Sequence, residues 1–193
     1  GELVDLGLRL QQHITAEFGV VFETAIGHAK PATQILDRHA HRLVVLVDPV
    51  NNSYVYAESQ YGELSKSVDG GTNFKKAKTG INTSDRTNWN TPVVFDPSNS
   101  QILYYGTNKM YKSIDRAVTW NVISPDLTNG NGGNNIGTLT CIAVAPGNSS
   151  VIYAGTDDGN VWKTTDGGLN WKKISTNLPV RWVTRIAVDF QNP

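Results

Sequence analysis

A short pattern centred on an aspartate occurs three times and constrains the fold more than any other feature of the chain. The copies span residues 67–74, 113–120 and 164–171, and each has a hydroxyl residue, any residue, Asp, four further positions and an aromatic residue. An aspartate at a chain reversal can accept hydrogen bonds from backbone N–H groups two or more residues later, which closes the turn. In two copies a pair of glycines follows and permits the positive φ that such a turn often needs. We therefore predict three hairpins in which Asp69, Asp115 and Asp166 are structural.

A longer period surrounds these hairpins. Pro49, Pro97 and Pro146 each end an apolar run and lie 48 and 49 residues apart, and a second apolar run follows each proline. Repeats of about 40 to 50 residues with four strand-like runs each are typical of propeller blades. The sequence thus predicts an all-β chain, an incomplete β-propeller of about three four-stranded antiparallel blades plus the first strand of a fourth.

The predicted blades span residues 42–80, 88–125 and 137–176, and the next blade starts at 182. Closed propellers have roughly 4–8 blades. We therefore expect the remaining blades of a larger parent chain to be partners of this one.

Residues 1–41 do not share the period, and we interpret them as an irregular or helical segment of uncertain origin. The segment contains His28, His39 and His41, of which the last two would share one face of a strand. No third ligand accompanies them at a spacing suited to zinc. We interpret them as surface histidines and predict neither a metal nor a cofactor.

Composition excludes several classes of partner. The chain has 17 Lys and Arg against 17 Asp and Glu, so no net charge attracts it to nucleic acid. No apolar window approaches the roughly 20 residues that span a bilayer. The single cysteine, Cys141, lies in an apolar run and is interpreted as a buried thiol. We expect neither nucleic-acid binding nor a membrane span.

The three repeats resemble the Asp-box, or bacterial neuraminidase repeat, family over residues 42–193. No copy matches the family pattern Ser/Thr-x-Asp-x-Gly-x-Thr-Trp in full, and the middle copy has Arg116, Ala117 and Val118 where the glycines and their neighbour would be. The resemblance implies a β-propeller in which the boxes are structural, in a secreted, periplasmic or cell-surface protein. The family includes sialidases and xyloglucanase-type endoglucanases, and also non-catalytic sortilin-like receptors and photosystem assembly factors. The Phe-Arg-Ile-Pro motif of sialidases is missing here.

Up-and-down strands, named A to D within a blade, sort the connections into two sets. The A–B and C–D turns share one end, which we name the turn end, and the B–C and D–A loops share the other, the loop end. Loops on a rigid scaffold are where binding usually takes place, and the longer, irregular connections belong to the loop end. The candidate binding residues there are Glu58, Asp85, Arg86, Trp89, Asp157, Asp158, Arg181 and Trp182.

Indole faces, carboxylates and amides together suit a sugar, whose C–H faces pack on Trp and whose hydroxyls need polar partners. Alternatively, Trp89 and Trp182 begin strand A and pack between blades, while the two arginines bridge loop carbonyls. Glycoside hydrolysis would need two carboxyl groups roughly 5–9.5 Å apart, and Asp157 and Asp158 could equally form a turn with Gly159. The leading hypothesis is a non-catalytic scaffold that binds polysaccharide or protein. The alternative is a fragment of a xyloglucanase-like or sialidase-like glycoside hydrolase.

Overall fold

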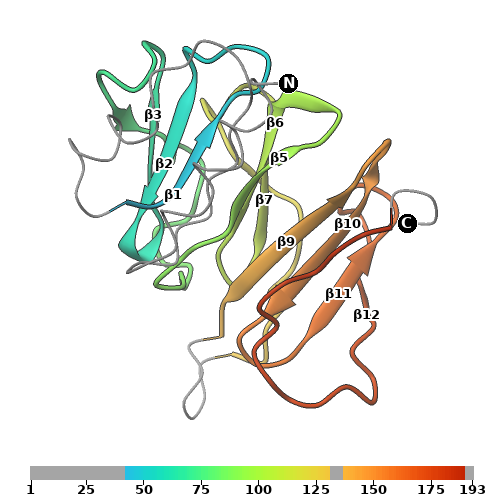
Figure 1. The fold of residues 1–193 in the computed structure, drawn as a ribbon. Coiled ribbons are helices and arrows are strands. Elements are labelled where there is room, and N and C mark those ends of the chain that lie inside the picture. Colours follow the sequence, from blue (N-terminus) through green and yellow to red (C-terminus); the bar gives the residue numbers. More distant parts are fainter. Residues whose placement is uncertain (1–41, 131–136, 190–193) are drawn as a thin grey trace, which may run out of the picture.

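The computed structural model describes residues 42–130 and 137–189, which form three four-stranded antiparallel sheets standing side by side (Figure 1). The expectations for residues 1–41, including their histidines, lie outside the described residues. In each sheet the strands pair in chain order, as in an up-and-down meander. The predicted fold class, an all-β chain forming an incomplete β-propeller, is confirmed in these three blades.

The strand bounds follow the predicted repeat. The first blade contains β1 (Arg42–Val47), β2 (Val55–Ser59), β3 (Glu63–Ser67) and β4 (Lys75–Lys76), with the 3-10 turn η1 (Gln60–Gly62) between β2 and β3. The second contains β5 (Val93–Asp96), β6 (Asn99–Gly106), β7 (Met110–Ser113) and β8 (Asn121–Val122). The third contains β9 (Leu139–Ala145), β10 (Asn148–Thr156), β11 (Val161–Thr164) and β12 (Lys172–Lys173). None of the helical structure within these residues is long and apolar enough to cross a bilayer.

Two hydrophobic clusters lie between blades, and a smaller third one lies within the first blade. One cluster joins the first blade to the second and includes Tyr56 and Leu64 on one side and Tyr105 and Trp120 on the other. An equivalent cluster joins the second blade to the third. Each blade therefore depends on its neighbour to bury its apolar face.

Each of the three aspartates bonds within its own turn. The Asp166 carboxylate accepts hydrogen bonds from the Asn170 backbone at 2.9 Å, the Asn170 amide at 2.8 Å and the Thr164 hydroxyl at 2.7 Å. These contacts lower the pKa of Asp166 to about 2. Asp69 and Asp115 accept the same kinds of bond in the other two turns.

The middle turn keeps this geometry without glycine. Arg116 and Ala117 have φ angles of 58° and 57°, where the first and third turns have glycines at positive φ. Arg116 also reaches the first blade, where its Nε lies 3.4 Å from the buried Asp48 carboxylate and its guanidinium carbon 4.6 Å from the centre of the Tyr54 ring. Its side chain thus joins two blades at the turn end.

The segment predicted to start a fourth blade runs beside the third. Val183 donates its backbone N–H to the Thr156 carbonyl at 3.1 Å, and its own carbonyl accepts a bond from the Thr140 hydroxyl at 2.6 Å. No strand is assigned within residues 181–189. A strand is defined by pairing with a neighbour, and the described residues supply none at this place.

Candidate functional site

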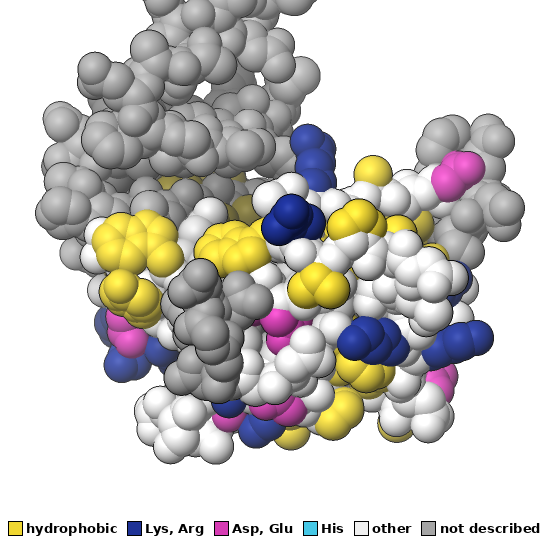
Figure 2. All heavy atoms as spheres, turned by 90° about the horizontal axis from the view of Figure 1, so that it is seen from below, with side chains coloured by type: hydrophobic (Ala, Val, Ile, Leu, Met, Phe, Trp, Pro, Cys, Tyr) yellow, Lys and Arg dark blue, Asp and Glu magenta, His cyan; other side chains and the backbone are white. Residues whose placement is uncertain are grey.

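The loop end of the propeller segment presents a mixed surface. Figure 2 looks onto this end and shows hydrophobic side chains scattered among polar and charged ones. Of the eight residues predicted as binding candidates, seven come from the B–C and D–A connections. The prediction was wrong for Glu58, which lies in the buried strand β2 and not on the B–C loop. Some of these residues are exposed and can contact a ligand. Others are buried, and their contacts hold the loops in place.

Two exposed aromatic side chains from different blades lie together at this end. Tyr61, on the B–C connection of the first blade, packs edge-to-face against Trp89, which precedes the second blade, with ring centroids 5.2 Å apart and an interplanar angle of 81°. The Tyr61 N–H also bonds to the Trp89 carbonyl at 3.0 Å. The exposed fractions are 53% for Tyr61 and 46% for Trp89. The pair, named here the aromatic platform, therefore offers about half of its surface to solvent.

Local backbone geometry fixes the tyrosine half of the platform. Tyr61 has φ of 58°, and Gly62 follows with φ of 74°. A Cβ atom at position 62 would lie 2.0 Å from the Tyr105 hydroxyl, which donates a 2.7 Å hydrogen bond to the Gly62 carbonyl. Only glycine fits this approach, and the tight turn directs the Tyr61 ring outward.

A pocket of about 460 Å³ adjoins the platform and lies between the first blade and the segment that follows β4. Its lining is mostly polar: Tyr61, Glu63, Lys76, Lys78, Thr79, Ile81, Asn82, Thr83, Asp85 and Thr87. Glu63 lies 3.4 Å from the Lys76 ammonium and 3.0 Å from that of Lys78. The hydrogen bond from Lys78, helped by the charges of both lysines, holds the pKa of Glu63 below its usual value despite partial burial. Opposite charges thus balance in a pocket that also carries hydroxyl and amide groups.

Asp85 closes one side of this pocket and is fully engaged with the second blade. Its carboxylate contacts the Lys109 ammonium at 3.0 Å, the Thr107 hydroxyl at 3.2 Å and the Tyr111 hydroxyl at 2.5 Å. Its side chain is 5% exposed. Burial and this carboxylate together raise the pKa of Tyr111 to about 12, so the hydroxyl stays a donor. These contacts anchor the loop that carries Asp85.

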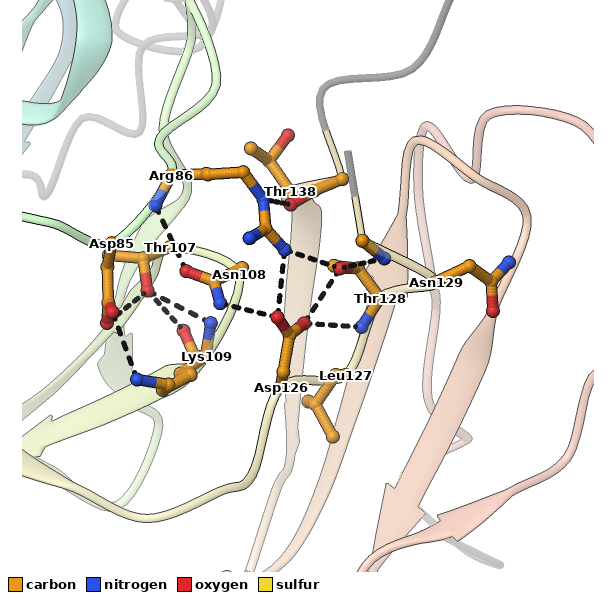
Figure 3. Close-up of polar contacts among 12 residues, drawn as sticks. Asp85, Arg86, Thr107, Asn108, Lys109, Asp126, Leu127, Thr128, Asn129 and Thr138 are labelled. Carbon is orange, nitrogen blue, oxygen red and sulfur yellow. Dashed lines mark hydrogen bonds and ion pairs between the residues drawn. The ribbon is translucent and has the colours of Figure 1, made fainter. Parts of the chain in front are cut away.

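Arg86 ties together the loops of neighbouring blades (Figure 3). Its guanidinium donates to the Gly137 carbonyl at 3.0 Å, the Asp126 carboxylate at 2.8 Å and the Thr128 hydroxyl at 2.9 Å. The Asn108 amide donates to the same carboxylate oxygen of Asp126 at 2.8 Å. The sequence left open whether this arginine bridges loop carbonyls or faces a ligand, and in the structure it bridges.

Asp157 holds the same segment from the opposite side. It accepts bonds from the backbone N–H groups of Gly137 at 3.1 Å and Thr138 at 3.0 Å. Asp158 accepts bonds from the Asn129 backbone and the Thr156 hydroxyl, both at 2.5 Å. The two aspartates are 1% and 6% exposed. Arg86 and Asp157 therefore both bind the segment of residues 137 and 138, and their hydrogen bonds form one continuous network.

Glu58 lies beneath the aromatic platform and is completely buried. Its Oε1 atom accepts hydrogen bonds from the Gly62 N–H at 3.1 Å and the Thr91 N–H at 3.2 Å, while Oε2 has no hydrogen-bond partner. Burial raises the pKa of Glu58 to about 8, against the lowering effect of these two bonds and of the Lys78 charge. The group is therefore largely a neutral acid at neutral pH.

The remaining two candidates, Arg181 and Trp182, follow the third blade and lie in the segment that runs beside it. The backbone of Val180 and Arg181 packs against Gly159, where an added Cβ atom would meet it at 3.0 Å. Trp182 follows and is 51% exposed. These residues contribute to the loop end beside the third blade, whereas the aromatic platform spans the first and second.

Sequence reasoning missed Tyr61, Glu63 and Lys78, which line the pocket. No spacing rule indicates them, because the pocket depends on how the segment after β4 lies against the first blade. One signal was present for Tyr61, since a Tyr-Gly pair between two strands favours a tight turn with an outward ring. Within residues 42–130 and 137–189, no three His, Cys, Asp or Glu side chains form a group able to hold a metal ion.

The chain is similar to fungal xyloglucanases. It is 28% identical over 148 residues to a xyloglucanase from Hypocrea jecorina, covering 68% of this chain and 17% of that protein. It is 31% identical over 153 residues to a probable oligoxyloglucan-reducing end-specific xyloglucanase from Neosartorya fischeri, covering 72% and 18%. The chain thus spans less than a fifth of the length of these curated relatives. No protein-family profile matches it.

Solved structures show the same architecture. The GH74 xyloglucanase from Xanthomonas campestris superimposes with a TM-score of 0.57 and 15% identity, covering 79% of this chain and 26% of that one. The GH74 enzyme from Niastella koreensis gives a TM-score of 0.53 and 24% identity, covering 70% and 23%. At these identities the likeness concerns the fold, and it supports a β-propeller segment.

Proposed function

We propose that the chain is part of a secreted glycoside hydrolase that acts on xyloglucan or a related β-glucan, and that its loop end binds the polysaccharide. The observation that carries the proposal is the aromatic platform of Tyr61 and Trp89 beside a polar pocket. Half-exposed aromatic faces next to hydroxyl, amide and charged groups are what a sugar chain needs for stacking and for hydrogen bonding. The activity named for the two fungal relatives supplies the substrate class.

Within this function we assign the described residues a binding role. The acidic candidates Glu58, Asp157 and Asp158 are buried, and the side chain of Asp85 is 5% exposed. Each of the four accepts hydrogen bonds from neighbouring protein groups. A general acid or a nucleophile must instead reach the scissile bond. We therefore place the catalytic carboxylates in other blades of the parent protein. We also propose that the three aspartate turns are Asp-box repeats with a purely structural role.

The proposal is tested on the parent protein with xyloglucan and with cellulose, starch and a host glycan for comparison. We expect hydrolysis of xyloglucan, and we expect Tyr61→Ala and Trp89→Ala each to raise KM by roughly 5- to 20-fold, which corresponds to about 1–2 kcal/mol of stacking per aromatic ring. Leu169→Ala, which trims an 84% exposed side chain at the turn end, is the matched control and should leave KM unchanged.

Three results would contradict parts of the proposal. If the parent protein binds xyloglucan without hydrolysing it, the hydrolase function is wrong and the chain is part of a binding scaffold. Turnover abolished by Asp85→Asn or Asp157→Asn, with the fold intact, would instead place catalysis within the described residues. Unchanged KM in both aromatic variants would remove the platform from the binding surface.

A further inference from the structure

The two loops that form the aromatic platform share one anchor. Glu58 Oε1 accepts the N–H of Gly62, which follows Tyr61, and also the N–H of Thr91, two residues after Trp89. A single carboxyl oxygen therefore holds the backbone on both sides of the platform. The inference below rests on the proposed sugar-binding function of that platform.

The other two blades have no counterpart to this anchor. The three blades can be aligned on the residue of strand B that pairs with the hydroxyl residue at the start of the C–D turn: Val55, Leu103 and Ile152. Three residues after it, the first blade has Glu58, whereas the second has Gly106 and the third has Gly155. At the two glycines a Cβ atom would meet Leu139 at 2.9 Å and Val183 at 2.5 Å, so apolar packing fills the space. Only the blade that carries Tyr61 puts a carboxyl group at this position.

The anchor is incompletely satisfied. Oε2 of Glu58 is buried without a hydrogen-bond partner. An ionised carboxylate in that setting lacks compensation for the water it has lost, whereas a neutral carboxylic acid tolerates it better. The ionisable groups of the described residues that interact with Glu58 are Lys78, from the segment after β4, and the Tyr105 hydroxyl on β6. Glu63 stands at the start of β3 on the same connection, and burial raises the pKa of Tyr105, which stays neutral.

We propose that the Glu58 carboxyl group is a proton-controlled latch, which holds the Tyr61 and Trp89 loops together while it is neutral and frees them when it ionises. Glu58 is thus a positioning residue for the sugar-binding platform. It touches no sugar itself.

The direction of the pH effect follows from linkage. The pKa of Glu58 is about 8 in the closed structure, and the ordinary value of 4.5 applies once the loops open and water reaches the group. The closed form therefore binds a proton that the open form releases between these two values. The equilibrium constant for closing the loops therefore falls up to roughly tenfold for each pH unit as the pH rises from 4.5 towards 8. Above pH 8 it falls no further.

The experiment uses the full chain and measures opening of the two loops in the absence of sugar. Amide hydrogen exchange at Gly62 and Thr91, expressed as protection factors, should fall at least tenfold in the wild type between pH 5 and pH 8. In Glu58→Gln, which keeps an acceptor oxygen but cannot ionise, protection should change less than twofold. Carbon NMR titration of the wild-type Glu58 carboxyl group gives its pKa directly, and a value near 4.5 would overturn the proposal.

A second variant keeps the test decisive should Glu58→Gln fail to fold. Lys78→Met removes the positive charge that favours ionisation of Glu58 in the closed form, so protection should still begin to fall near pH 4.5 but should level off at a higher pH than in the wild type. A wild-type protein with constant protection at both amides, or a Lys78→Met variant whose protection levels off at the same pH as that of the wild type, would contradict the latch.

Sugar binding is then measured separately with xyloglucan oligosaccharides. If the proposed function is correct, affinity of the wild type should follow the same fall with pH, and affinity of Glu58→Gln should not. Absence of binding at every pH, together with pH-dependent protection, would refute the proposed function and leave the latch standing. Binding whose affinity is constant from pH 5 to pH 8 in the wild type would refute the latch as a control of the platform.

Discussion

At the scale of single residues, Arg116 shows why one turn departs from the repeat pattern. It takes a left-handed backbone conformation that costs a non-glycine residue roughly 1 kcal/mol. In return its guanidinium reaches the buried carboxylate of Asp48 and the face of Tyr54 in the preceding blade. The inter-blade contact thus explains an arginine at a position where the first and third turns have glycine.

Arg116→Gly is therefore expected to lower the free energy of unfolding although it relieves backbone strain. Loss of the partner leaves the Asp48 charge in a buried site, and we expect a net cost of about 1–3 kcal/mol, between the values for exposed and fully buried ion pairs. Ala117→Gly is the matched control, because it relieves the neighbouring φ of 57° and removes only one methyl group. Urea unfolding measures both, and an Arg116→Gly variant as stable as the wild type would contradict the role given to the ion pair.

At the scale of elements, the tryptophan that ends the second and the third aspartate turn joins its blade to the preceding one. The indole N–H of Trp120 donates to the Ala77 carbonyl at 2.9 Å, and that of Trp171 donates to the Ile123 carbonyl at 2.8 Å. Both acceptors directly follow the last strand of the preceding blade. The ring is buried between sheets while its polar edge satisfies a backbone group, which suits tryptophan better than any other residue.

Trp171→Phe should destabilise the junction of the second and third blades by about 1–2 kcal/mol, the cost of leaving a partly buried carbonyl without its donor. Trp89→Phe changes an exposed tryptophan at the loop end in the same way and should stay within roughly 0.5 kcal/mol of the wild type. Thermal unfolding followed by circular dichroism distinguishes the two, and equal effects would indicate that ring volume matters and the indole bond does not.

The elements were predictable because their signals are local. A glycine, an aspartate or a proline fixes a turn within a few residues, and apolar runs between turns fix the strands. The candidate site was predictable only to the level of which end of the blades it occupies. Whether Arg86 points to a ligand or to the Gly137 carbonyl, and whether Glu58 is solvated or buried, depends on how far the next blade approaches. Chain order and periodicity carry no such information, although a glutamate at a position held by glycine in two other repeats was a sign that something differs there.

At the scale of the whole molecule, the third blade exposes the kind of face that the other two bury. Tyr56, Tyr104 and Tyr153 occupy equivalent positions, each paired with a lysine of the next strand. The first two are fully buried against the following blade, whereas Tyr153 is only half-buried. Ile174 and Leu178, which follow β12 of the same blade, are 40% and 56% exposed. Such a face favours association, either with a further blade of the parent chain or with a second copy.

We therefore expect the isolated chain to be marginally stable or to self-associate through this face. Sedimentation velocity should show concentration-dependent oligomers, and Ile174→Asp with Leu178→Asp should shift the chain towards monomer. Val68→Asp, at an exposed position of the turn end, is the control and should leave association unchanged. A monodisperse wild-type monomer with a high and sharp melting transition would contradict this expectation.

The placement of the hydrophobic clusters between sheets has a consequence for how such a chain changes in evolution. Since the two larger hydrophobic clusters lie between neighbouring sheets, a sheet inserted by gene duplication changes only the two interfaces on either side of it, and all other interfaces keep their side-chain packing. Gain or loss of a single repeat is therefore tolerated wherever the new neighbours match in shape. Deletion of half a repeat would instead expose the apolar faces of both neighbouring sheets at once.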